Sequence, residues 1–169
     1  MRSVSPPPVE QGRLEQIARH EAGHVVVGEA MGLQLQDVDV LPDPDGGRGH
    51  THFRAPDGWP PNNGLSPAQR DFVERVLTAF MAGHVAESAT GIADPDGSAY
   101  DFDTAFREWL SYLTKDPEEQ RQILGRCTQR ANSILGRREA RAALRAVADA
   151  LLEKSRLSAA EATAIVQAI

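Results

Sequence analysis

The residues best suited to chemistry lie in the segment His20-Glu21-Ala22-Gly23-His24, an H-E-x-x-H pattern. On a helix this spacing places the two imidazoles one turn apart on one face, about 6 Å apart along the axis. Two neutral imidazoles in that arrangement can ligate one zinc ion, with Zn–N distances of about 2.0–2.1 Å. Glu21 would lie beside the ion, where it could take a proton from an attacking water and give it to a leaving amine.

The motif is expected on the first long helix of the chain, from about Gln11 to Met31. Apolar residues recur at helical spacing along this stretch, and Gly32 is placed to end it. The preceding residues 1–9 contain three consecutive prolines and are expected to form a disordered tail.

The rest of the pattern predicts a mainly helical fold with one small β-hairpin. Residues 35–41 and 50–54 read as the two strands, with a turn between them. Capping sequences at 66–69, 116–119 and 158–161 predict three helix starts, and further helices are expected over 99–113 and 137–154. With 169 residues and no long linker, the chain is expected to form one domain over residues 10–169.

A catalytic zinc needs a third protein ligand besides the two histidines. Metzincins carry a histidine six residues beyond the second histidine of the motif, where this chain has Ala30, so that class is excluded. A thermolysin-like site would need a later glutamate, where the chain has a turn rich in Asp, Pro and Gly, and Glu29 points away from the zinc face. The remaining candidates lie on later elements, and the residue pattern leaves them open: His50, His52, His84, Glu87, Asp101 and Asp103.

Four segments resemble the peptidase domain of the FtsH family of zinc proteases. Residues 17–24 are similar to its zinc-binding helix, and residues 82–87 (Ala-Gly-His-Val-Ala-Glu) to its Gly-Gly-Arg-x-Ala-Glu segment. Residues 98–105 (Ser-Ala-Tyr-Asp-Phe-Asp-Thr-Ala) are similar to its Gly-Ala-x-x-Asp-x-x-x-Ala-Thr stretch, and residues 134–166 to its C-terminal helices. The resemblance covers roughly residues 11–169 and implies a single-domain, helical, zincin-like metallopeptidase.

The resemblance also implies roles for individual residues. Asp101 stands where the family has its ligating aspartate, so it is the implied third zinc ligand. Asp103 is the less favoured alternative, because it lies about 200° round a helix from Asp101. Glu87 matches the family's acid and could orient a ligating histidine through its second ring nitrogen. His84 replaces the family's arginine, and whether it donates to the site, competes as a ligand or is an ordinary helix residue stays open.

The FtsH family joins its peptidase to an AAA ATPase, but the phosphate-binding signature of such a motor is missing from this sequence. A Walker A loop needs Gly-Lys followed by Ser or Thr, and the two lysines, Lys115 and Lys154, follow Thr and Glu. The chain is therefore expected to cleave flexible or unfolded polypeptides without ATP, or to rely on a partner ATPase. The family implies a ring, usually of six subunits, yet monomer, dimer and hexamer all stay open.

Two further functional expectations concern the substrate and the alternative to catalysis. The strand near Val38–Leu41 is expected to pair with an extended substrate as an added strand.

The alternative function is a catalytically idle zinc-binding interaction module descended from such a protease. Glu21 argues against that alternative, because a silent scaffold has no physical need for a base beside zinc.

Composition narrows the partners and the compartment. A net charge of −6 argues against nucleic acid as the main partner, and no apolar run approaches the length of about 20 residues that a membrane span needs. The first ten residues lack the apolar core of a signal peptide, so a cytoplasmic location is expected. The lone Cys127 excludes an internal disulfide and is expected to be a small, at least half-buried side chain. The arginines that gather between residues 121 and 145 are expected to form a solvated face of two helices or a subunit contact.

Overall fold

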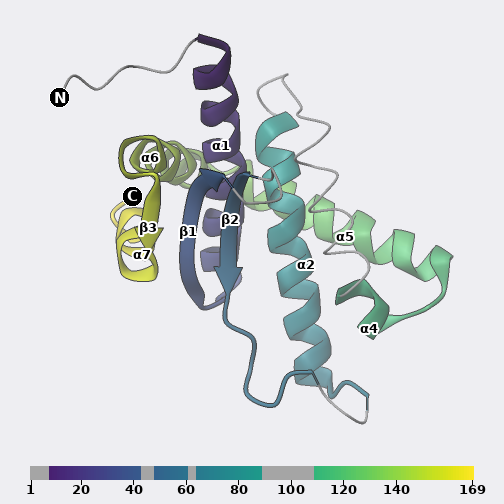
Figure 1. Ribbon diagram of the computed structural model, residues 1–169. Coiled ribbons are helices and arrows are strands. Elements are labelled where there is room, and N and C mark those ends of the chain that lie inside the picture. Colours follow the sequence, from purple (N-terminus) through teal and green to yellow (C-terminus); the bar gives the residue numbers. More distant parts are fainter. Residues whose placement is uncertain (1–7, 43–47, 61–63, 89–108) are drawn as a thin grey trace.

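The computed structural model describes residues 8–42, 48–60, 64–88 and 109–169 (Figure 1). Its helices are α1 (Pro8–Ala30), α2 (Pro67–Ser88), α4 (Ser111–Leu113), α5 (Pro117–Leu135), α6 (Arg138–Lys154) and α7 (Ala159–Gln167). Strands β1 (Leu35–Pro42), β2 (Arg48–Phe53) and β3 (Arg156–Ser158) form one antiparallel sheet. The predicted mainly helical class is confirmed. No helix in these ranges combines the length and the hydrophobicity that crossing a membrane requires.

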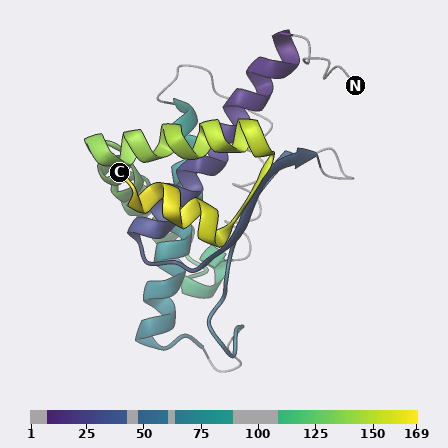
Figure 2. The same cartoon turned by 90° about the vertical axis from the view of Figure 1, so that its left-hand side faces the viewer.

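Helix α1 is the centre of the arrangement. Helices α2 and α5 pack on one side of it and α6 on the other, while β1 and β2 lie against it as well (Figures 1 and 2). Residues 20–28 of α1 are all buried as a result. A helix that is buried all round is normally apolar all round, yet this stretch includes His20, Glu21 and His24. Those polar groups need specific partners inside the protein.

Two apolar clusters hold α1 from opposite sides. In the first, Val26 and Val27 belong to a core shared with Leu77 of α2 and Ala131 of α5. In the second, Val25 belongs to a core that continues through the sheet and α6, with members such as Ala22, Val38, Leu151 and Leu157. The motif helix is therefore fixed by packing on both faces, which limits the movement of its side chains.

The three predicted helix starts are confirmed. Ser66 and Gln69 exchange the reciprocal hydrogen bonds of a capping box at the start of α2. Ser158 and Glu161 do the same at the start of α7. The Asp116 side chain accepts a hydrogen bond from a backbone N–H in the first turn of α5.

Two helix boundaries differ from the prediction or cannot be compared with it. Helix α1 begins at Pro8, three residues before the predicted start, and so includes the last two residues of the predicted tail. A proline is compatible with the first helical turn because its missing N–H would have no helical partner there. The predicted helix over 99–113 is described only from residue 109, and α4 occupies Ser111–Leu113.

The sheet has a third strand that the sequence analysis missed. The strand order is β2-β1-β3, so Val38 of β1 lies opposite Thr51 of β2 and Leu157 of β3. The backbone N–H of Val40 donates to the carbonyl of Ser155 on the β3 side at 2.9 Å. The prediction that the strand at 38–41 pairs with a substrate is therefore wrong, because β1 is the central strand and both of its edges are taken.

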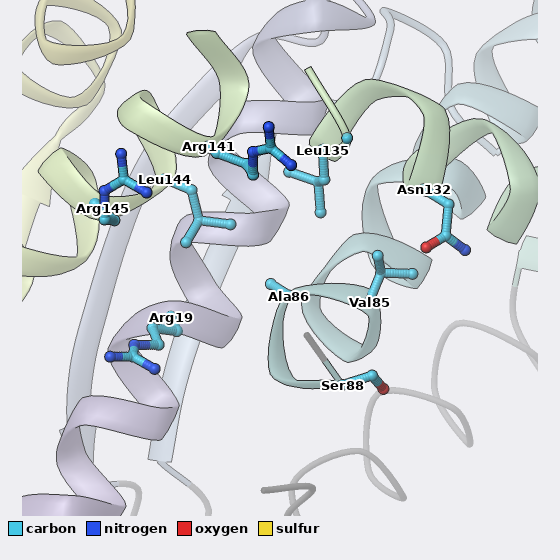
Figure 3. Close-up of a pocket in the computed structure, with 10 residues that line it drawn as sticks. Arg19, Val85, Ala86, Ser88, Asn132, Leu135, Arg141, Leu144 and Arg145 are labelled. Atoms are coloured by element: carbon cyan, nitrogen blue, oxygen red, sulfur yellow. The ribbon is translucent and has the colours of Figure 1, made fainter. Parts of the chain in front are cut away.

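A cavity of about 590 Å³ opens where α1, α2, α5 and α6 meet (Figure 3). Its wall includes Arg19 of α1, Ala86 of α2 and Leu135 of α5. His20 and His24 are not among the residues that line it. The cavity is therefore separate from the motif face of α1.

Gly23 sets the distance between α1 and α2. A Cβ atom at this position would lie 2.6 Å from the carbonyl oxygen of Ala82 and 2.9 Å from Cβ of Ala86. Gly23→Ala must therefore push the helices apart, and we expect it to lower the free energy of unfolding, measured in urea, by about 1–3 kcal/mol. Gly12→Ala is the control on the same helix, since a Cβ there meets nothing within 4 Å. Gly12→Ala should raise the free energy of unfolding by up to about 1 kcal/mol. Equal effects of the two substitutions would contradict the close approach of α1 and α2 at Gly23.

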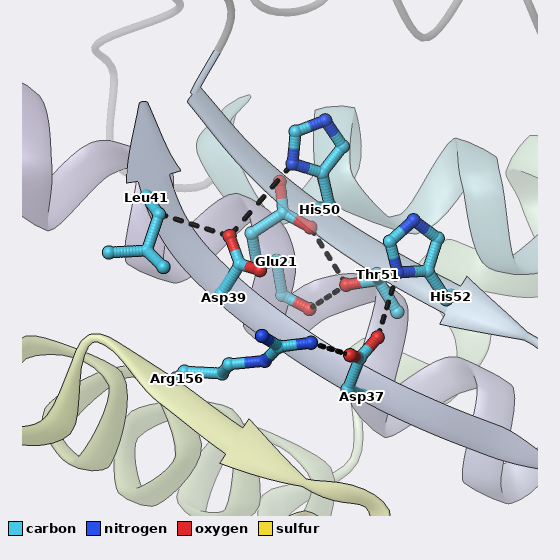
Figure 4. Close-up of polar contacts among 8 residues, drawn as sticks. All are labelled: Glu21, Asp37, Asp39, Leu41, His50, Thr51, His52 and Arg156. Atoms are coloured by element: carbon cyan, nitrogen blue, oxygen red, sulfur yellow. Dashed lines mark hydrogen bonds and ion pairs between the residues drawn. The ribbon is translucent and has the colours of Figure 1, made fainter. Parts of the chain in front are cut away.

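Asp37 joins β1 to both of its neighbours. Its carboxylate accepts hydrogen bonds from the Arg156 guanidinium of β3 and from Nδ1 of His52 on β2, the latter at 2.7 Å (Figure 4). The hydrogen bond from Arg156, and after it the one from His52, holds the pKa of Asp37 below its ordinary value. A depressed pKa means that the folded state favours the ionised form of this carboxyl.

The stability contributed by Asp37 should therefore depend on pH. It is present above the pKa of the unfolded chain and is lost as the pH falls below about 4, through the lower pKa of the folded state. The side chain is 23% exposed, so the contribution is at most about 1 kcal/mol. Measured by urea unfolding at neutral pH, Asp37→Asn should have a free energy of unfolding lower than the wild type by this contribution. As the pH falls below about 4, the wild type should lose the same contribution and the variant should not. Asp57→Asn changes a fully exposed side chain and should leave the stability and its pH dependence as in the wild type. The same result for Asp37→Asn would show that the contacts of Asp37 contribute nothing.

Candidate metal centre

Helix α1 brings His20, Glu21 and His24 together as a group of potential metal ligands. One potential ligand atom from each of the three lies within 4.8 Å of the other two. The two imidazole centroids are 4.5 Å apart, and the rings are nearly perpendicular, at 85°. All three residues are buried, with exposed fractions of 5%, 4% and 3%. The helical spacing alone is enough to create this group, as the sequence predicts.

Both histidines are oriented through Nδ1. Nδ1 of His20 lies 2.9 Å from Oε1 of Glu87, and Nδ1 of His24 lies 2.8 Å from the carbonyl oxygen of Ala79. A carbonyl oxygen can only accept, so Nδ1 of His24 carries the proton in that hydrogen bond. A carboxylate at Glu87 imposes the same tautomer on His20. In each ring Nε2 is then the nitrogen suited to ligating a metal, and both Nδ1 contacts are of the kind that metal-binding histidines make.

Gly83 of α2 packs closely against both imidazoles. A Cβ atom at position 83 would lie 2.5 Å from Nε2 of His20 and 2.6 Å from Cε1 of His24. Any larger residue would therefore occupy the space against the Nε2 edges of the two rings. The helix that orients both imidazoles, through Ala79 and Glu87, can thus approach the two rings closely because position 83 has no side chain.

Strand β2 holds the Glu21 carboxylate from the other side (Figure 4). The hydroxyl of Thr51 donates to Oε2 of Glu21 at 2.7 Å. A Cβ atom at Gly49 would lie 2.6 Å from Oε1 of Glu21, and Gly49 has a φ of +85°, which a side chain would strain. Glu21 is therefore buried between its own helix and β2, with its carboxylate oriented by a hydroxyl donor.

The other histidines proposed from the sequence do not belong to this group within the described residues. His50 and His52 stack on each other, with ring centroids 5.7 Å apart, and they lie beside Asp39 and Asp37 of β1. His84 is half-buried on α2. Glu87 contacts His20 at Nδ1 and is likewise outside the group. Asp101 and Asp103 lie outside the described residues.

Three residues that border the centre were not predicted from the sequence: Gly49, Thr51 and Gly83. One of them carried a usable signal: Thr51 alternates with His50 and His52, so on a strand it faces the opposite side, toward α1. The two glycines had no such signal, because their role depends on which part of α1 packs against them.

A scan against protein-family models finds no model that matches this chain, and a search of curated proteins finds no similar sequence. The resemblance to the FtsH peptidase domain therefore depends on the motif segments themselves.

Proposed function

We propose that this chain is a zinc-dependent endopeptidase that hydrolyses flexible or unfolded polypeptides. The observation that carries the proposal is the set of contacts around the motif: two adjacent histidines oriented through Nδ1, with a buried glutamate beside them. Burying three ionisable groups in the core of a small protein costs stability, and such clusters are typical of functional sites. Packing alone gives no reason for this combination.

The donor set fits zinc. Imidazole nitrogens and a carboxylate oxygen are ordinary zinc ligands, and His20, Glu21 and His24 bring such atoms within 4.8 Å of one another. His20 and His24 would supply two ligands, and we propose Asp101 as the third on the strength of the resemblance. Zinc held there would supply Lewis-acid activation of water and of a peptide carbonyl.

Glu21 would perform the proton transfers. The hydrogen bond from Thr51 to Oε2 would hold the carboxylate while it takes the proton of the attacking water and delivers it to the leaving amine. Glu87 and the carbonyl of Ala79 would keep the proton of each imidazole on Nδ1. An idle zinc module would need none of this support around Glu21, so the geometry favours the enzyme over that alternative.

The substrate would bind along β2. In the described sheet β2 is an edge strand, with β1 on one side, and its Thr51 contacts Glu21. An extended polypeptide added to the outer edge of β2 would therefore run past the proposed base. We propose that the chain belongs to the FtsH-type peptidases and acts in the cytoplasm. It would form a homo-oligomer, or a partner ATPase would deliver folded substrates to it.

Removal of the metal tests this function. The purified, zinc-loaded chain should cleave casein or a mixed peptide library without ATP. Treatment with a strong chelator should abolish cleavage, and one equivalent of zinc should restore it, whereas added ATP should change nothing. The proposal would be refuted if the zinc-loaded protein cleaved neither casein nor the peptides, or if cleavage continued in the presence of the chelator.

A further inference from the structure

The cavity between α1, α2, α5 and α6 has the size and the lining of a ligand site. Its volume of about 590 Å³ falls within the range of about 300–1,000 Å³ that is common for small-molecule sites. Apolar side chains from three helices form much of its wall: Val85 and Ala86 of α2, Leu135 of α5 and Leu144 of α6. An apolar group that entered the cavity would therefore be removed from water on several sides.

Three arginines give the cavity a positive side. Arg19 of α1 and Arg141 and Arg145 of α6 lie across the cavity from the end of α2 that carries Val85 and Ser88 (Figure 3). Arg141 and Arg145 are one helical turn apart, so their like charges face the same region. No acidic side chain of the described residues lines the cavity or pairs with these three guanidinium groups. Within the described residues, the charge on this side of the cavity therefore favours an anion.

We propose that this cavity binds an organic carboxylate with an apolar body. The carboxylate would lie against Arg141, Arg145 and Arg19, because guanidinium groups bind carboxylates through paired, charge-assisted hydrogen bonds. The apolar body would extend toward Val85 and Leu135. A free medium-chain acid has this chemistry, and so does the C-terminus of a peptide that ends in an apolar residue. The site is independent of the metal centre and of the proposed peptidase activity.

Calorimetric titration of the purified protein tests both the charge and the apolar part of the ligand. Octanoate should bind with one site per chain and at least about ten-fold more tightly than octanamide, while octylamine should not bind. From hexanoate to decanoate, kept below micelle-forming concentrations, affinity should rise about three- to fourfold for each methylene group until the cavity is full. N-acetyl-Ala-Leu with a free carboxyl group, compared with its C-terminal amide, tests the peptide source.

A charge reversal inside the cavity and one outside it decide whether the binding is at this site. Arg141→Glu should weaken binding of the carboxylate about ten-fold or more, while Arg138→Glu, which lies on the same helix but does not line the cavity, should leave it unchanged. Thermal melts check that both variants fold, and Arg19→Gln replaces Arg141→Glu if that variant does not. Arginine-dependent binding of octanoate or of the peptide acid supports the site and names its source. The proposal is overturned if neither octanoate nor N-acetyl-Ala-Leu binds, or if the two charge-reversal variants bind the carboxylate equally well.

Discussion

Glu21→Gln is expected to lower the rate of casein cleavage by about 10²–10⁴-fold while leaving the bound zinc in place. Glutamine has the shape of glutamate and can still accept the hydrogen bond that Thr51 donates. It cannot take up a proton from the attacking water, so the loss should fall on the chemical step. The contacts of His20 and His24 through Nδ1 do not involve Glu21, so metal affinity should be preserved.

The measurement combines initial cleavage rates with elemental analysis of the same samples. Glu15→Gln provides the control, because Glu15 lies on the same helix but outside the motif and is partly exposed. This control should keep both activity and zinc. Undiminished cleavage by Glu21→Gln would exclude its role as the base. Zinc-loaded wild-type protein as inactive as the variant would favour the idle module instead.

Gly83→Ala is expected to weaken zinc binding by at least about 10–100-fold, a loss comparable to that caused by removing a residue that supports a metal ligand. The new methyl group would lie 2.5 Å from Nε2 of His20 and 2.6 Å from Cε1 of His24. Both rings would have to move, and a metal site tolerates ligand displacements of only about 0.2 Å. The metal-free protein should also lose about 1–3 kcal/mol of stability through overpacking.

Titration with zinc against a competing fluorescent chelator measures this affinity. Gly125→Ala is the matched control, because Gly125 lies on helix α5 and a Cβ there meets nothing within 4 Å. It should bind zinc like the wild type and be slightly more stable, since alanine favours helices over glycine. Wild-type zinc affinity in Gly83→Ala would show that metal binding does not depend on the close approach of Gly83 to the two rings.

The parts of the molecule that depend on neighbours along the chain could be predicted from the sequence. The spacing of His20 and His24 places both on one face of any helix, whatever surrounds it. The caps at Ser66, Asp116 and Ser158 likewise act within one turn, and all three were found. These predictions are reliable because the interactions that decide them are local.

The rest depends on contacts between distant segments. Strand β3 has three residues between two helices, too few for an alternating pattern, and it exists because β1 offers an edge for it. Thr51 and Gly83 matter only because β2 and α2 pack against the motif helix at those points. Glu87 was proposed through its resemblance to a family segment, and the spacing of 67 residues from His20 gives no local sign of their contact.

Zinc content tests the central claim most directly. After exhaustive dialysis, elemental analysis of the wild-type chain should give about one zinc per chain, and His24→Gln should give close to none. His52→Gln, which removes an exposed histidine of β2, should keep the wild-type value. A wild-type protein without zinc, or a His24→Gln variant that retains it, would contradict the claim that the two motif histidines of α1 form a metal centre.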